Sequence, residues 1–303
     1  MISSIYKICL LFVNLLLYST FLFSETSFPG INIFPSPVKL SMGGAGFLKA
    51  SPSSFNLNPS VNNGKIFSAS IIRYPASIIS QNAGFIFPMK NNGFGGLSIN
   101  YVSYGTFQGF DEDAQATGSF NSSDTRISAS HSKRLFKLPI MVGISSSIHL
   151  SNYNNHDIIF FTLNGGVHLK VDRYGTLMGM SINDFGKNIS NIQIDFSPRI
   201  IYSVAKELKH LPLTFYMDII PENKSSYAMY LGGEFAINDN FEFLLGTSTR
   251  KFDQNIEKDF FTSIIGSTGM GFGYDAKATI INYGVFMYGT GSLVHGIEIG
   301  ISF

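Results

Sequence analysis

The segment that ends the chain alternates between two kinds of side chain, and this alternation constrains the fold more than any other feature. Odd positions are mostly large and apolar and even positions are mostly small or polar: the odd set is Leu293, His295, Ile297, Ile299, Ile301 and Phe303, and the even set is Val294, Gly296, Glu298, Gly300 and Ser302. A period of two indicates a β-strand with one apolar face. Residues 227–237 and 241–248 repeat the pattern. We therefore expect a sheet with an apolar face and a small or polar face.

The composition agrees with a sheet and argues against several other classes of protein. Of the 303 residues, 45% are hydrophobic and only 14% are charged, whereas a soluble domain has about 25% charged residues. The 30 Gly, 29 Phe and 14 Tyr suit strands and tight turns better than helices. The 21 basic and 20 acidic side chains leave no surplus to hold a phosphate backbone. The sequence thus argues against an all-helical soluble protein and against nucleic-acid binding.

Turn residues divide the chain after residue 64 into an even number of strand candidates. These are 65–74, 78–87, 94–104, 124–135, 139–151, 158–170, 175–184, 198–207, 211–220, 227–237, 241–250, 260–273, 276–288 and 293–303, which makes 14. Short links alternate with longer ones, of which the longest are 105–123, 185–197 and 251–259. A β-sandwich would also alternate, but short periplasmic turns, longer outer loops and a polar lumen face are typical of outer-membrane barrels. No tryptophan is present, so tyrosine and phenylalanine would form the interfacial girdles.

The N-terminus has the pattern of a secretory signal peptide. Lys7 precedes an apolar run at 8–23, which small residues follow. The run is short for a membrane-spanning helix, which needs about 20 residues. We therefore expect cleavage near Ser24 rather than a retained anchor. The only cysteine, Cys9, would leave with the signal peptide.

Residues 25–64 contain five prolines and no sustained period, so they form neither a strand nor a long helix. Gly43, Gly44 and Gly46 can bring backbone close to backbone, because glycine has no Cβ. Asn58 precedes Pro59 and is thereby restricted to an extended or turn conformation. A barrel of about 14 strands leaves a water-filled lumen unless something fills it. We therefore expect a plug inside the barrel, and the alternative is a periplasmic tail.

The segment LSMGGAGFLKASPSSFNLNPS at 40–60 resembles the N-terminal signature of the PorV/PorQ family, which is itself related to FadL-type outer-membrane proteins. The family pattern has alanine after Asn-Pro, whereas this chain has Ser60. The resemblance continues through 104–124, 208–215 and 281–303 and is closer to the PorQ branch. It thus covers nearly the whole mature chain, although each motif is loose.

The resemblance implies an accessory barrel of the type IX secretion apparatus, which would anchor a surface attachment complex beside PorZ-, PorU- and PorV-like partners. Two alternatives remain: a FadL-like channel for hydrophobic molecules, and a structural barrel. The length of the mature chain favours the anchor, because little remains for an outer domain that captures lipid. The outer loops would then be the docking surfaces, with Asp111, Glu112, Asp113, Asn191 and Gln254 as candidate contact residues.

The sequence contains no pattern that indicates catalysis or a cofactor. The six histidines are scattered, and no pair has the i, i+4 spacing of a helical zinc site. An EF-hand loop from Asp111 would require glutamate where Ser122 stands. We therefore expect a non-enzymatic protein without a cofactor or metal. Ile299, Ile301 and Phe303 resemble the terminal signal read by the barrel-insertion machinery.

These observations predict an all-β protein, a transmembrane antiparallel β-barrel of about 14 strands, in the outer membrane of a Gram-negative bacterium. Residues 1–24 would be the signal peptide, 25–64 the plug-like or periplasmic segment, and 65–303 the barrel, which contacts outer-membrane lipid.

Overall fold

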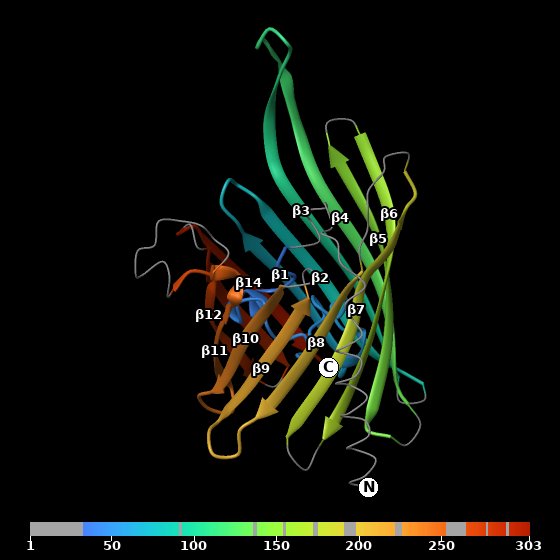
Figure 1. The fold of residues 1–303 in the computed structure, drawn as a ribbon, viewed down its shortest axis with the longest axis vertical. Coiled ribbons are helices and arrows are strands. Elements are labelled where there is room, and N and C mark those ends of the chain that lie inside the picture. The colour runs from blue at the N-terminus through green and yellow to red at the C-terminus, as the bar shows by residue number, and fades with distance from the viewer. Residues whose placement is uncertain are drawn as a thin grey trace.

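Fourteen antiparallel strands form a closed barrel, as the sequence predicts. The computed structural model describes residues 33–90, 93–135, 138–153, 156–171, 175–190, 198–221, 226–252, 265–276, 278–288 and 291–303. Each strand pairs with its neighbours in sequence, and β1 closes the ring on β14 (Figure 1). The strands are β1 (Ile66–Arg73), β2 (Ile79–Met89), β3 (Gly93–Phe110), β4 (Ala116–Arg134), β5 (Ile140–Tyr153), β6 (His156–Val171), β7 (Thr176–Asn188), β8 (Arg199–Glu207), β9 (Leu213–Pro221), β10 (Tyr227–Ala236), β11 (Phe241–Ser248), β12 (Thr268–Ala276), β13 (Thr279–Met287) and β14 (Leu293–Ser302).

The register places the apolar set of β14 on the outer surface. Ile299 pairs with Ala69 of β1 and is 55% exposed, whereas the preceding Glu298 is only 3% exposed and faces the interior. Large apolar side chains are exposed in the same way on strands around the ring, among them Leu97, Ile127, Ile148, Leu245 and Phe272. Such a band matches the hydrocarbon core of a bilayer. The protein therefore lies in the outer membrane of a Gram-negative bacterium. None of the described helices is long and apolar enough to span a membrane.

The third and fourth strands are longer than the sequence predicts. The expected 19-residue loop at 105–123 is instead mostly strand, because β3 and β4 stay paired from Thr106–Asn121 to Phe110–Ala116. Register shifts at Ser103/Thr106 and Gly109/Phe110 mark irregularities in the pairing, and bulges of this kind bend and twist a ribbon. Only 111–115 form the turn. The hairpin rises well above the neighbouring strands (Figure 1).

Two smaller differences concern strand ends. The sequence predicts a strand from residue 260, but β12 begins at Thr268 and the described residues 265–267 are not strand. β7 continues to Asn188, into the predicted loop 185–197.

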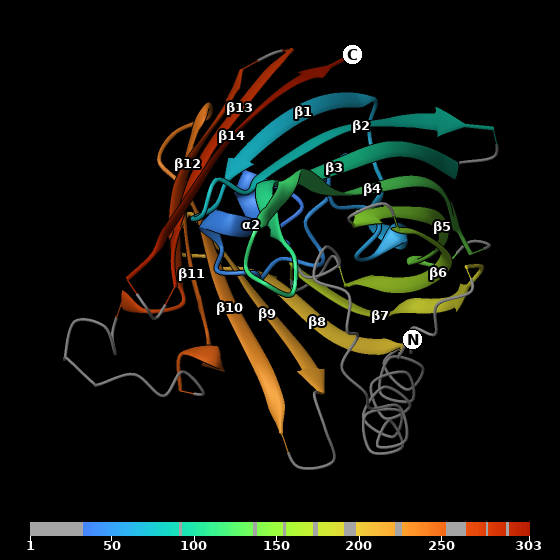
Figure 2. The ribbon, with the colours of Figure 1, turned by 90° about the horizontal axis from the view of Figure 1, so that it is seen from above.

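Residues 33–64 run inside the barrel and are called the plug here (Figure 2). The plug contains a helix, α2 (Pro37–Ser41), and a 3-10 turn, η2 (Pro59–Val61). α2 packs against β11 to β14, and η2 packs against β4 to β6 on the other side of the lumen. The plug thus touches both walls. The predicted signal peptide and residues 25–32 lie outside the described residues.

Candidate functional site

Inward-facing glycines seat the plug directly against the barrel wall. A Cβ at Gly246 would overlap the carbonyl of Met42, and one at Gly269 would overlap the carbonyl of Leu40. Further inward-facing glycines lie close to plug atoms; they are Gly84 at Pro52, Gly96 at Phe55, Gly143 at Pro59, Gly166 at Asn58, Gly179 at Leu48, Gly271 at Ser41 and Gly284 at Pro37. Because these contacts come from both walls and involve backbone and side-chain atoms of the plug, the plug fits the lumen closely.

The three plug glycines named in the sequence analysis adopt the left-handed backbone conformation. Gly43, Gly44 and Gly46 have φ of 61°, 96° and 90°, which side chains other than glycine rarely adopt. Gly43 also lies against the backbone of Gly246. The structure thus places this run at a tight turn pressed on β11.

Asn58 and Pro59 begin η2, with Asn58 as its N-cap. Asn58 is extended, at φ −149° and ψ 95°, and its Oδ1 accepts hydrogen bonds from the backbone N of Ser60 at 3.2 Å and from Ser60 Oγ at 2.6 Å. Ser60 Oγ in turn lies 3.0 Å from Nδ1 of His168 on β6. This cap ties the second end of the plug to the wall.

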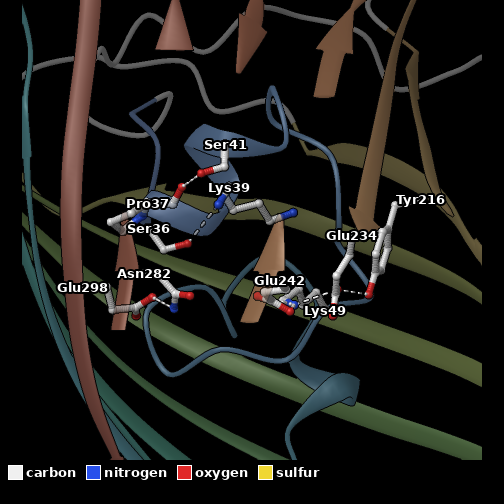
Figure 3. Close-up of polar contacts among 10 residues, drawn as sticks. All are labelled: Ser36, Pro37, Lys39, Ser41, Lys49, Tyr216, Glu234, Glu242, Asn282 and Glu298. Atoms are coloured by element: carbon white, nitrogen blue, oxygen red, sulfur yellow. Dashed lines mark hydrogen bonds and ion pairs between the residues drawn. The ribbon is translucent and has the colours of Figure 1, made fainter. Parts of the chain in front are cut away.

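Charged groups of the wall hold the middle of the plug. A carboxylate oxygen of Asp218 accepts a hydrogen bond from the backbone N of Gly46 at 2.6 Å. Lys49 Nζ lies 2.7 Å from Glu234 and 3.4 Å from Glu242, and the hydroxyl of Tyr216 donates to Glu234 at 3.0 Å (Figure 3). Burial lowers the pKa of Lys49, but Glu234, Tyr216 and Glu242 outweigh burial, so this pKa lies above its usual value.

Glu298 is a second buried carboxylate with plug contacts. Ser53 Oγ donates to Glu298 Oε1 at 3.0 Å. Asn282 Nδ2 donates to Glu298 Oε2 at 3.1 Å (Figure 3). Hydrogen bonds to a charged group are stronger than neutral ones. This carboxylate therefore fixes the Ser53 region of the plug to β13 and β14.

An outer cavity of about 200 Å³ lies above the plug, next to the strand ends that lead into the outer connections. Aromatic side chains from plug and wall line it: Phe34, Phe47, Tyr230, Phe286 and Tyr288. Lys39 of α2 also lines it and is 4% exposed. Burial lowers the pKa of Lys39 to about 7, although Asp218 acts in the opposite direction. The cavity is thus aromatic with a buried amine at its edge.

An inner cavity of about 630 Å³ lies on the other side of the plug, next to the periplasmic strand ends. Its lining mixes apolar groups, such as Leu48 and Val61, with charged groups, such as Arg134, Lys170 and Glu207. The two cavities therefore flank the plug from opposite sides of the membrane.

The remaining predicted residues lie away from these cavities. Ile299, Ile301 and Phe303 are exposed on the outer face, and the backbone N of Phe303 donates to the carbonyl of Lys65 at 2.9 Å. Asp111, Glu112 and Asp113 are exposed at the tip of the β3–β4 hairpin. Asn191 and Gln254 lie outside the described residues. In the part of the chain that the structure describes, no three His, Cys, Asp or Glu side chains gather as a metal site would require.

The sequence alone did not identify the residues that hold the plug, namely Lys49, Asp218, Glu234 and Glu242, nor Lys39 at the outer cavity. Glu234 and Glu242 gave one signal, because each is a charged residue on the small or polar face of an alternating strand. Their partner Lys49 is 185 and 193 residues away in sequence, so no local pattern links them.

Comparison with known proteins identifies the fold of the chain but not its family. No family model matches the chain, and no curated protein matches it. A solved structure titled CymD monoaromatic hydrocarbon channel matches with a TM-score of 0.58 and 11% identity, over 88% of this chain and 97% of that one. A Pseudomonas aeruginosa FadL homologue matches with a TM-score of 0.52 and 9% identity, over 93% and 98%. The chain therefore shares the barrel fold of FadL-type outer-membrane channels.

Proposed function

We propose that this protein is an outer-membrane channel for small hydrophobic molecules, in which the plug controls passage through the lumen. The anchor role that the sequence favours is less well supported than this alternative. The fold is shared with a monoaromatic hydrocarbon channel and with a FadL homologue. Fold alone does not determine function, because one fold hosts many functions. The proposal therefore rests on the lumen itself.

The position of two adjacent plug residues supports the channel most strongly. Phe47 lines the outer cavity and Leu48 lines the inner cavity. Likewise, Leu57 lines the outer cavity and Val61 lines the inner cavity. The plug backbone around residue 47 thus lies between the two cavities. In the proposed channel, a shift of this turn connects them.

The outer cavity has the lining that an apolar substrate needs. Aromatic rings and aliphatic side chains such as Ile201 and Ile220 surround it. Apolar cavities with a few polar groups are the usual form of small-molecule sites. A hydrophobic molecule would enter here from outside and pass to the larger, more polar inner cavity.

Uptake of a hydrocarbon tests the channel. Cells that express the protein should take up radiolabelled ethylbenzene faster than cells of the same strain that lack it. The control is a barrel of equal surface level in which 33–64 are intact but an unrelated outer residue, Asp113, is changed to Asn. Equal uptake with and without the protein would contradict the channel.

A second candidate function is the attachment of a surface partner, of the PorZ, PorU or PorV kind, through the β3–β4 hairpin. The observation that favours it is the long projecting ribbon, which carries stacked Phe107 and Phe120 with ring centroids 5.6 Å apart and the 62% exposed Phe110. Exposed phenylalanines on a hairpin that projects from the barrel are suited to contact with another protein. Replacing 107–120 with a short Gly-Ser turn should leave the barrel folded and release a co-purifying partner. If no protein co-purifies with the intact chain, the attachment role is excluded for this hairpin.

A further inference from the structure

Among the residues that the structure describes, the charged groups that line the outer cavity all have the same sign. They are Lys39 of the plug, Arg199 at the start of β8, and Arg250 after β11. Arg199 is paired with Asp184, and the guanidinium of Arg250 lies 5.8 Å from the ring centroid of Tyr230. Cationic side chains in a cavity favour an anionic ligand over a cationic one.

Lys39 is the cation of this set whose charge is least compensated. Its Nζ is buried and donates no hydrogen bond within the described part of the chain. The ring of Phe47 contacts it, with the ring centroid 3.8 Å from Nζ. Asp218 is the acid that influences Lys39, but one of its oxygens already accepts from the plug backbone at Gly46 and Phe47. A buried ammonium without an acceptor is costly, and a ligand carboxylate would supply that acceptor.

The size and the rings of the cavity restrict the rest of the ligand. The volume of about 200 Å³ is below the roughly 300–1,000 Å³ of sites for drug-sized ligands. Phe34 and Phe286 lie with ring centroids 4.9 Å apart, and Phe286 and Tyr288 meet edge to face at 5.1 Å. Such a cluster offers both faces and edges to another ring. One aromatic ring therefore fits better than a long chain.

We propose that the outer cavity binds a small aromatic monocarboxylate, with its carboxylate on Lys39 and its ring among the aromatic side chains. The inference deepens the proposed channel function, because the cavity is the outer vestibule of that channel. It adds an anionic class of substrate to the neutral hydrocarbons considered above. The carboxylate would accept hydrogen bonds from Lys39 Nζ, and the ring would pack against the aromatic side chains of the cavity in place of water.

Ligand binding to the purified full-length protein in detergent tests the assignment. The probe is 4-fluorobenzoate, followed by fluorine NMR, and fluorobenzene is the matched probe without the carboxylate. The key variant is Lys39→Met, which keeps the apolar part of the side chain and removes the charge. The matched control is Lys170→Met, because Lys170 lines the inner cavity instead.

The wild type and Lys170→Met should bind 4-fluorobenzoate saturably and at least tenfold more tightly than fluorobenzene. Lys39→Met should lose this preference, so that the two probes bind with equal affinity. Heat-dependent gel mobility establishes that each variant is folded. The proposal is wrong if the wild type does not bind 4-fluorobenzoate saturably, if fluorobenzene binds as tightly, or if Lys39→Met keeps the preference.

Failure of this inference is separable from failure of the channel. Uptake of ethylbenzene does not require a carboxylate partner, so a channel without this site would still take up the hydrocarbon and not bind 4-fluorobenzoate. Conversely, Lys39-dependent binding of 4-fluorobenzoate without ethylbenzene uptake would support the carboxylate site and contradict the channel function.

Discussion

The side-chain oxygen of Asn58 occupies the space that a Cβ on Gly166 would need. This contact joins the plug to β6 at the point where Asn58 also caps η2. Gly165, the preceding residue of the same strand, has open space around its Cβ position. The two glycines therefore separate the effect of the plug contact from the general effect of replacing glycine.

Gly166→Ala should destabilise the folded protein by about 1–3 kcal/mol, as overpacking of a well-packed interior does, because Asn58 has to move. Gly165→Ala should change stability by less than about 1 kcal/mol. Thermal unfolding in detergent, followed by heat-dependent gel mobility, measures both. Equal midpoints for the two variants would mean that the plug does not press on β6 at Asn58.

Charge placed on the outer face should cost most at the centre of the bilayer. Ile299→Arg should reduce stability by about 2–4 kcal/mol, whereas Leu293→Arg, which is exposed at the outer end of the same strand, should cost about 0–1 kcal/mol. The amount of folded barrel in the outer membrane and its unfolding in urea compare the two. Tolerance of arginine at Ile299 would contradict the register of β14.

The two ends of the barrel should differ in access to an impermeant maleimide. Only Cys9 would compete for the label, and it belongs to the predicted signal peptide. Asp113→Cys, at the hairpin tip, should react on intact cells, and Asp239→Cys, between β10 and β11, should react only after the outer membrane is opened. Asn191→Cys and Gln254→Cys remain predicted to behave like Asp113→Cys. Reaction of Asp239→Cys on intact cells would reverse the orientation.

Removal of Lys49 should loosen the plug. Lys49→Met leaves Glu234 and Glu242 without their shared cation. We expect a loss of about 1–2 kcal/mol, which is discounted for partial solvent screening because these side chains are about a fifth to a quarter exposed. Lys133→Met, an exposed lysine on β4, should change stability by no more than about 0.5 kcal/mol. Thermal unfolding at neutral pH compares the two variants. Equal stability of Lys49→Met and Lys133→Met would show that the ion pairs of Lys49 do not stabilise the plug.

Alternation predicted the barrel because each spanning strand has one face in lipid and one in the lumen, which fixes a period of two. The β3–β4 hairpin escaped prediction because its outer half lies beyond the membrane. Residues such as Gly105, Ser119 and Asn121 there are not divided between an apolar and a polar face, so strand and loop look alike.

The sequence indicates that the lumen face of the barrel carries glycines, but it does not identify the plug residues that contact them. Glycines at Gly246, Gly269 and Gly271 keep the strand period, but sequence does not tell which segment fills the space beside them. The outer cavity depends on rings from residues 34, 47, 230, 286 and 288, which are brought together only when the barrel closes around the plug.

Uptake through a barrel with a locked plug tests the channel most directly. The Cβ of Ala45 lies 3.0 Å from the Cβ position at Gly232 of β10, close to the 3.5–4.5 Å that a disulfide spans. In Ala45→Cys/Gly232→Cys, ethylbenzene uptake should fall to the level of cells without the protein under oxidising conditions and return on reduction, and Ala45→Cys alone should be insensitive to oxidation. If the oxidised, fully cross-linked barrel takes up ethylbenzene as fast as the reduced one, the plug does not control passage and the proposed channel function is contradicted.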